Sequence, residues 1–335
     1  MQKFARLLVL LILVSRAFSG AEAVAAAPAL KIGFILATMQ EERYQKDKKA
    51  FEEAVTKLGG QVYFASCNNS EQSQAAQVDN LLSKGIQALV IQPVNGETAA
   101  AFVKQAKQDG VPVVSYDRLI KSAPIDAYIT EDAEKVGALE AEAAVKFTGG
   151  KGNYVILMGQ AGDPNAEART AGALHVLARH PAIRIVVKQY HNGWSPELAM
   201  KTMENALTQQ KNDIQAVIAN NSGMARGAVQ ALEEQKLAGK VFVAGADADL
   251  AAVRDIVAGK QHFEVYVPIQ DMAESAARTA VALARKEKFK FDLKTSNGAL
   301  EVPTVASPAL GVDRASIDAR LIQTGFHTRQ AVYGK

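Results

Sequence analysis

The sequence has only one cysteine among its 335 residues, and 6% of its residues are aromatic. The lone thiol, Cys67, has no partner for an internal disulfide, and it lies too far along the chain to carry a lipid at a processed N-terminus. The sequence also lacks the ~20 consecutive apolar residues that a membrane-spanning helix needs. We therefore expect neither a disulfide scaffold nor a lipid or helical membrane anchor.

The sequence carries little excess charge of either sign. Its formal net charge is +3 and 48% of its residues are hydrophobic. The first 25 residues contribute +2 of this charge through Lys3, Arg6, Arg16 and Glu22, which leaves about +1 for the remainder. This balance is typical of a soluble chain of about two domains, and it does not favour nucleic acid as a partner.

Metal-binding and phosphate-binding motifs are missing as well. The sequence contains no HExxH or CxxC, and His175 and His180 are five residues apart rather than the four that would place both on one helix face. Gly149, Gly150 and Gly152 precede a predicted strand, whereas a phosphate-binding loop follows one. No acidic calcium-binding loop is present. We expect no metal site and no cofactor.

Candidate catalytic residues are sparse. Ser222 lacks the surrounding glycines of a nucleophile elbow, and we interpret it as an ordinary loop serine. Asp247 and Asp249 are an acid–base pair only if the chain is a hydrolase; binding of hydroxyls or helix capping are the alternatives. We therefore expect a protein that is not an enzyme.

The N-terminal segment has the layout of a secretory signal peptide. Two basic residues precede the apolar run 7–14, and small residues follow at Ala21, Ala23 and Ala25. We expect residues 1–25 to be removed and the mature protein to be located in the periplasm.

Short apolar segments alternate with segments of helical period in the first part of the chain. Strands are predicted over 31–36, 62–65, 88–91 and 111–116, and helices over 45–58, 71–84 and 98–108. Continuous apolar strands separated by helices are typical of a parallel sheet that is covered on both faces. This pattern predicts a doubly wound α/β lobe.

The same alternation restarts after residue 135 and predicts a second lobe of the same kind. Its predicted helices are 136–147, 166–180, 196–208 and 225–234, and its predicted strands are 153–158, 183–189, 216–219 and 241–244. A helix over 272–287 returns to the first lobe. We expect a first lobe of 31–130 plus 267–303, a second of 131–266 plus 304–335, and three hinge crossings near 129, 266–268 and 303–307.

Polar side chains recur after the predicted strands, in the loops 40–44, 92–95, 117–118, 159–165, 191–194, 220–222 and 246–249. Ligands of open α/β sheets bind beyond the carboxyl ends of the strands, so these loops should face one cleft. Arginine, aspartate and asparagine suit vicinal hydroxyls, while Tyr44 and Trp194 offer flat faces to a sugar ring. Helix capping is the alternative for each aspartate or asparagine, and core packing is the alternative for Trp194.

Several longer motifs support a sugar-binding interpretation. They are EERYQKD at 41–47, VVSYDRLI at 113–120, EKVG at 134–137, NGW with PE at 192–197, MENAL at 203–207 and GADADL at 245–250. With these motifs the sequence resembles, over residues 31–327, the periplasmic sugar-binding proteins related to ribose- and galactose-binding proteins, most of all their D-xylose-binding members. The resemblance implies a type I periplasmic binding protein fold that closes on a monosaccharide.

The resemblance also implies the partners and the site. The partners would be an ABC permease with its ATPase, and the chain would be a monomer. A chemoreceptor or sensor kinase is an alternative partner; a sugar-responsive repressor would need a DNA-binding segment where the signal peptide lies. The implied sugar-binding residues are Arg43, Tyr44, Asp117, Arg118, Asp163, Asn165, Trp194, Asn221 and Asp247.

Four positions depart from the xylose-binding pattern. Tyr44 replaces a tryptophan, Ser222 an aspartate, Ala246 a glutamine and Val267 a lysine, and the loop that contains Asp163 is one residue shorter. The loss of a lysine removes a hydrogen-bond donor and enlarges the expected pocket, so a hexose or a deoxysugar is an alternative ligand.

Overall fold

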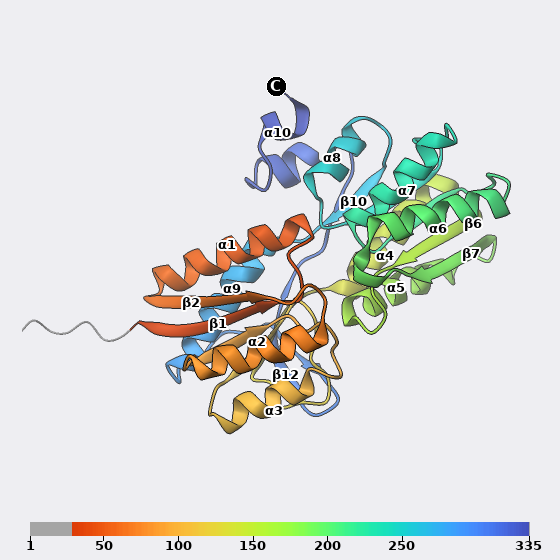
Figure 1. Ribbon diagram of the computed structural model, residues 1–335. Coiled ribbons are helices and arrows are strands. Elements are labelled where there is room, and N and C mark those ends of the chain that lie inside the picture. Colours follow the sequence, from red (N-terminus) through yellow and green to blue (C-terminus); the bar gives the residue numbers. More distant parts are fainter. Residues whose placement is uncertain (1–28, 335) are drawn as a thin grey trace, which may run out of the picture.

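The protein is described by a computed structural model that covers residues 29–334, and it forms two α/β lobes (Figure 1). The predicted signal peptide, 1–25, lies outside the described residues. In the first lobe the strands are β1 (Leu30–Leu36), β2 (Gly60–Ser66), β3 (Ala88–Ile91), β4 (Val113–Tyr116), β5 (Ala127–Glu131), β11 (Leu293–Ser296) and β12 (Glu301–Ser307). The helices of this lobe are α1 (Glu42–Lys57), α2 (Glu71–Ser83), α3 (Ala100–Gln108) and α9 (Ile269–Ala284).

The second lobe repeats this construction. Its strands are β6 (Gly152–Met158), β7 (Ile183–Tyr190), β8 (Ala216–Ala219), β9 (Phe242–Ala246), β10 (Phe263–Tyr266) and β13 (Leu310–Val312). Its helical elements are α4 (Ala133–Thr148), α5 (Pro164–Leu177), η1 (Asn192–Trp194), α6 (Pro196–Gln209), α7 (Ser222–Glu234), α8 (Leu250–Val257), η2 (Asp318–Ile322) and α10 (Arg329–Tyr333).

Each lobe is built on one sheet whose strands are mostly parallel. The order is β11-β12-β5-β4-β3-β1-β2 in the first sheet and β13-β10-β9-β8-β6-β7 in the second. Only the β11–β12 and β10–β13 pairs are antiparallel. The predicted fold class, two doubly wound parallel-sheet lobes, is confirmed.

Apolar side chains cover both faces of each sheet, as the continuous apolar strands predict. In the first lobe one core cluster includes Val78 of α2 and Val103 of α3, and the other includes Phe51 of α1 and Met272 of α9. In the second lobe α6 and α7 cover one face, while α4 and α5 cover the other. The packed sheets are the rigid supports from which the loops of the site project.

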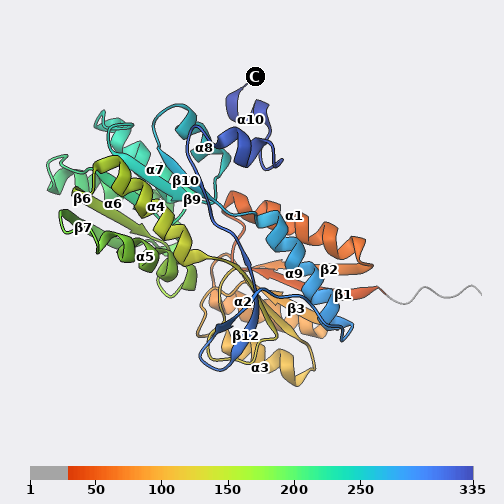
Figure 2. The same ribbon diagram turned by 180° about the vertical axis from the view of Figure 1, so that it is seen from behind.

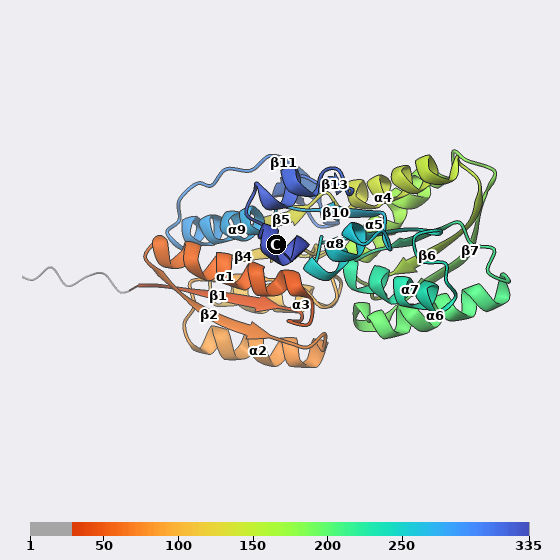
Figure 3. The same ribbon diagram turned by 90° about the horizontal axis from the view of Figure 1, so that it is seen from above.

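Three segments of the chain connect the lobes (Figure 2). They run from β5 to α4, from β10 to α9 and from β12 to β13. Strand β12 remains in the first sheet to Ser307, which pairs with Glu131, so this sheet extends beyond the boundary expected at residue 303. Figure 3 shows the two lobes side by side with these segments between them.

Three helices of the second lobe begin earlier than hydrophobic periodicity predicts; α4 starts at Ala133 instead of 136, and α5 and α7 also start early. Helix α5 starts at Pro164 instead of 166, because the Asp163 side chain accepts a hydrogen bond from the Asn165 backbone N–H. Helix α7 starts at Ser222 instead of 225, because Asn221 caps the Met224 N–H. Both caps therefore lie at the carboxyl ends of the sheet, where the predicted site begins.

Within residues 29–334, no helix combines the length and the apolar character needed to cross a membrane.

Candidate functional site

A small cavity of ≈ 10 Å³ lies between the lobes. Its lining comes from the loops after the strands and from the starts of the following helices. The lining residues are Glu41, Arg43, Tyr44, Asp117, Arg118, Asn165, Arg169, Trp194 and Asp247. A single water molecule needs ~10–15 Å³ of such space, so a larger ligand enters only if the lobes or the side chains around the cavity move apart.

Two lining aspartates are held in an uncommon backbone conformation. Asp117 follows β4 with φ 63°, and Asp247 follows β9 with φ 96°. Neighbouring strands hold both turns, since the Asp117 N–H donates to Ile129 O at 2.7 Å and the Asp247 N–H donates to Val265 O at 2.9 Å. Residues in sparsely populated backbone regions cost ~1–3 kcal/mol each and are concentrated at functional sites. The sheets thus impose the turns at both aspartates.

Arg43 joins the two aspartates from opposite lobes. Its Nη2 lies 3.2 Å from Asp117 Oδ1, and its Nη1 lies 3.4 Å from Asp247 Oδ1. Asp47, one turn later on α1, lies 3.5 Å from Arg43 Nε and accepts a hydrogen bond from Tyr116 OH. These contacts fix the guanidinium at the centre of the closed cleft.

A second network surrounds Asp117 and Tyr44. Gln92 Nε2 donates to Asp117 Oδ2 at 2.6 Å and lies 2.9 Å from Tyr44 OH. Asn165 of the second lobe donates to Asp117 Oδ1 at 3.2 Å. Burial disfavours ionisation of Asp117, but the guanidiniums of Arg43, Arg118 and Arg169 outweigh it and lower the pKa of this carboxyl. Asp117 is therefore a carboxylate with acceptor capacity facing the cavity.

Arg118 crosses to the second lobe and contacts the aromatic side of the site. Its Nε lies 2.8 Å from Asp163 Oδ2, and its guanidinium carbon lies 6.0 Å from the centroid of the Trp194 ring. Trp194 Nε1 donates to the same Asp163 oxygen at 3.0 Å. The indole is 5% exposed. Asp163 thus holds both the arginine and the ring in place from behind the lining.

Arg169 on α5 supplies a third buried guanidinium. It donates through Nε and Nη2 to Glu131 Oε1 at 2.9 and 2.5 Å, and its Nη2 lies 3.2 Å from Asp247 Oδ1. Helices α4 and α5 approach closely at this point. If Gly137 of α4 had a side chain, its Cβ would lie only 1.7 Å from Arg169 O. Glycine at this position therefore lets α5 carry Arg169 into the site.

Carboxyl groups outnumber the three guanidiniums when those directly behind the cavity lining are counted with it. Burial raises the pKa of Glu41 to about 8 and that of Asp47 to about 7. Burial also raises the pKa of Glu131 and that of Asp163, although Arg169 and Arg118 oppose these shifts. Protonation of such groups brings the net charge of the site closer to zero, which suits an uncharged polar ligand.

The structure brings together seven of the nine residues predicted for the site. Arg43, Tyr44, Asp117, Arg118, Asn165, Trp194 and Asp247 all line the cavity. Asp163 lies behind the lining. Asn221 is not among the lining residues, and its side-chain oxygen caps α7 at 2.9 Å from Met224 N. The capping alternative therefore describes Asn221, while Asp163 combines capping with the support of Arg118 and Trp194.

The departures at Ser222, Ala246 and Val267 do not enlarge this cavity. Ala246 and Val267 lie in an apolar cluster of the second lobe and are not lining residues. Ser222 Oγ lies 2.7 Å from Glu264 Oε2 and accepts a hydrogen bond from the Asp249 N–H at 3.1 Å. The expectation of a wider pocket beside Val267 was wrong, because the valine packs into the core of the lobe.

Sequence reasoning missed two lining residues, Glu41 and Arg169. A signal for Arg169 exists: it occupies the buried stripe of α5 between Ala166 and Ala173, where a charged side chain requires a buried partner. The partner, Glu131, comes from the end of β5 in the other lobe. No local sequence pattern connects two residues that far apart.

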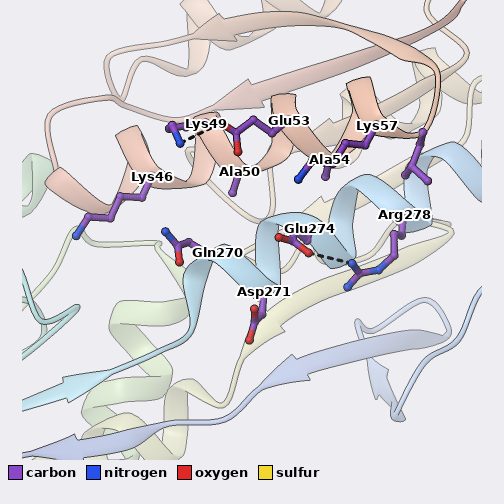
Figure 4. Close-up of a pocket in the computed structure, with 11 residues that line it drawn as sticks. Lys46, Lys49, Ala50, Glu53, Ala54, Lys57, Gln270, Asp271, Glu274 and Arg278 are labelled. Carbon is purple, nitrogen blue, oxygen red and sulfur yellow. Dashed lines mark hydrogen bonds and ion pairs between the residues drawn. The ribbon is translucent and has the colours of Figure 1, made fainter. Parts of the chain in front are cut away.

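A larger groove of ≈ 390 Å³ lies on the first lobe between α1 and α9 (Figure 4). Its charged side chains already pair with one another: Lys49 lies 2.9 Å from Glu53, and Arg278 lies 3.2 Å from Glu274. The Lys49 side chain is 75% exposed. The groove lacks the convergent buried polar groups of the interlobe cavity, which is the better candidate site.

Among residues 29–334 there is no cluster of three or more potential metal ligands.

Two α/β lobes that enclose a small polar cavity define a solute-binding architecture. The chain belongs to the family described as "Periplasmic binding protein domain", whose pattern matches residues 32–288. It is 40% identical to the D-xylose-binding periplasmic protein of Haemophilus influenzae, over 91% of this chain and 92% of that one. It is 42% identical to the corresponding protein of Escherichia coli, over 89% and 91%.

A solved structure supports the fold assignment. An ABC transporter solute binding protein from Clostridium phytofermentans with bound β-D-glucose superposes with a TM-score of 0.84 and 25% identity, over 90% of this chain and 99% of that one. The similarity covers both lobes.

Proposed function

We propose that this chain captures D-xylose, or a closely similar monosaccharide, in the interlobe cavity and delivers it to an ABC importer. The observation that carries the proposal is the lining: three guanidiniums, two aspartates, an asparagine and two aromatic rings converge on one buried cavity between the lobes. A sugar presents vicinal hydroxyls and apolar C–H faces, and these groups match both features. Two relatives at 40% and 42% identity carry the name of D-xylose-binding protein.

The proposed roles follow from the contacts. Arg43, Asp117 and Asp247 hydrogen-bond hydroxyls from both lobes, and Arg118 and Asn165 complete the polar set. Tyr44 and Trp194 contact the faces of the ring. Asp163 and Asn221 act one layer further out, as positioning residues at the starts of α5 and α7.

Ligand contacts from both lobes favour the closed state over the open one, so binding shifts the population toward closure. The segments after β5, β10 and β12 are the proposed hinges. The closed shape is what we expect an ABC permease, or a chemoreceptor or sensor kinase, to recognise. We further propose a periplasmic monomer without a cofactor and without enzymatic activity.

Calorimetric titration of the purified mature protein tests the proposal. D-xylose should bind with saturable 1:1 stoichiometry and raise the melting temperature, because a ligand at ~100 times its Kd adds about 2.7 kcal/mol to stability. D-glucose is the informative second ligand, since a structural relative binds it. Binding of glucose but not xylose would keep the role and change the sugar, whereas no response to any monosaccharide would contradict the proposal.

A further inference from the structure

Glu41 precedes α1, and its side chain has no structural role as a helix cap. Its backbone has the extended conformation of an N-cap residue, with φ −85° and ψ 142°, but its side chain makes no capping hydrogen bond. The first turn is closed by the backbone instead, through the Tyr44 N–H and Glu41 O at 3.2 Å. The carboxyl group is therefore free for another role.

The Glu41 carboxyl faces the cavity with an unused oxygen. Glu41 is partly exposed as a residue, yet its Oε1 is buried and has no hydrogen-bond partner. Buried polar atoms without partners are uncommon, and each costs ~1–3 kcal/mol. Because Glu41 lines the cavity beside Asp247, a ligand in the cavity is within reach of this oxygen.

The charged surroundings of Glu41 come from both lobes. Arg43, Arg118 and Tyr44 lie on its own lobe, and Asp247 and Asp249 approach from the loop before α8 on the other. The Glu41 carboxyl thus lies near two carboxyl groups of the other lobe in this closed arrangement. Such an arrangement is stable when a proton, or a hydrogen-bond donor, lies between them.

We propose that Glu41 is a specificity-determining residue, which hydrogen-bonds a sugar hydroxyl through its buried Oε1. The inference rests on the proposed sugar-binding function and deepens it. A protonated carboxyl both donates and accepts, as a hydroxyl requires. It therefore favours a monosaccharide with a hydroxyl at this position over the corresponding deoxysugar.

A pH dependence of binding follows from this protonation. Burial raises the pKa of Glu41 from its ordinary value of 4.5 to about 8 in the closed cleft, so closure takes up a proton. The contribution of Glu41 to affinity is complete below pH 4.5 and is lost as the pH rises toward about 8. Burial also raises the pKa of Asp249, to about 7, so this group likewise makes the affinity fall as the pH rises.

The test compares Glu41→Gln and Glu41→Leu with the wild type and with Glu53→Gln, an exposed position on the same helix. D-xylose and its monodeoxy analogues are titrated at about pH 5.5 and about pH 8.5. We expect wild-type affinity for D-xylose to fall at least ~10-fold over this range, and Glu41→Gln to reduce that fall while retaining binding. Glu41→Leu should weaken binding about 10-fold to 100-fold for every ligand except the analogue that lacks the contacted hydroxyl.

The outcomes separate the two proposals. If the wild type binds no monosaccharide, the proposed function is wrong and this inference is wrong with it. If the wild type binds D-xylose while both Glu41 variants match Glu53→Gln in affinity and in pH dependence, only the inference is overturned. Glu41→Gln is nearly isosteric, so it gives a decision even if Glu41→Leu does not fold.

Discussion

Glu42 Oε2 accepts a hydrogen bond from the backbone N–H of Leu250 at 3.0 Å, and this contact joins the first lobe to the start of helix α8 in the second. Glu42 also pairs with Lys46 at 2.9 Å, and Lys46 lies 3.8 Å from the centroid of the Phe326 ring, again across the lobes. A carboxylate at a helix N-terminus satisfies a free N–H and complements the helix dipole. These contacts form a closing latch, defined by Glu42, Lys46, Leu250 and Phe326, outside the cavity.

Glu42→Ala should weaken sugar binding without touching the cavity. Loss of a helix-capping side chain costs ~0.5–2 kcal/mol. Because this contact joins the two lobes, its loss destabilises only the closed, sugar-binding state, and Kd should rise about 2-fold to 30-fold. Calorimetry on Glu42→Ala, Glu42→Gln and Glu53→Ala gives the measurement and its control. A Kd equal to that of Glu53→Ala would show that the latch does not contribute to closure.

Asp117→Asn should nearly abolish binding while preserving the fold. Asparagine tolerates the positive φ of 63° and keeps the size of the side chain, but it removes the charge that faces Arg43. Asp47 and Asp247 still face the guanidinium, so the fold should survive, but removing one partner of a buried charge pair at a binding site costs ~2–5 kcal/mol of binding free energy. Titration with D-xylose measures the loss, and a melting curve shows whether the variant folds. Near wild-type affinity would remove Asp117 from the proposed site.

The fold followed from the sequence because the alternation of apolar strands with segments of helical period repeats in both halves of the chain. Sequence periodicity could not locate β12, which lies beyond the last predicted helix and pairs with β5. Nor could it fix the starts of α5 and α7, since the caps Asp163 and Asn221 add a turn before the apolar stripe begins.

The site was predictable where strand ends carry polar residues, and unpredictable where a helix interior supplies them. Asp117 and Asp247 follow strands directly, so topology alone places them at the cleft. Arg169 lies two turns into α5 and needs Glu131 from the other lobe. Val267, by contrast, was expected at the site and lies elsewhere. The resemblance suggested a pocket position, but this side chain is 1% exposed and packs within a core cluster.

Gly137→Ala should displace Arg169 and weaken both stability and binding. The new Cβ would lie 1.7 Å from Arg169 O, so α4 and α5 must separate. Overpacking of this kind costs ~1–3 kcal/mol or more, measured as the free energy of unfolding in urea. Glu142→Ala, at an exposed position of the same helix, is the control. Equal stability of the two variants would show that the helix contact tolerates a methyl group.

Glu264→Gln should flatten the dependence of stability on pH. Burial raises the pKa of Glu264 from 4.5 to about 8, although Ser222 Oγ and the Ala248 N–H hydrogen-bond its Oε2. A group whose pKa is higher in the folded state takes up a proton on folding. Its contribution is therefore complete below pH 4.5 and declines as the pH rises toward about 8.

Glutamine keeps the size and the hydrogen-bonding capacity of the protonated acid. The melting temperature of Glu264→Gln should thus match the wild type near about pH 5 and exceed it near about pH 8.5. Because Glu264 lies behind Ser222 rather than in the cavity lining, D-xylose affinity at the lower pH should change less than about 3-fold. A variant that is less stable than the wild type at the higher pH would mean that Glu264 folds as a carboxylate, held charged by its donors.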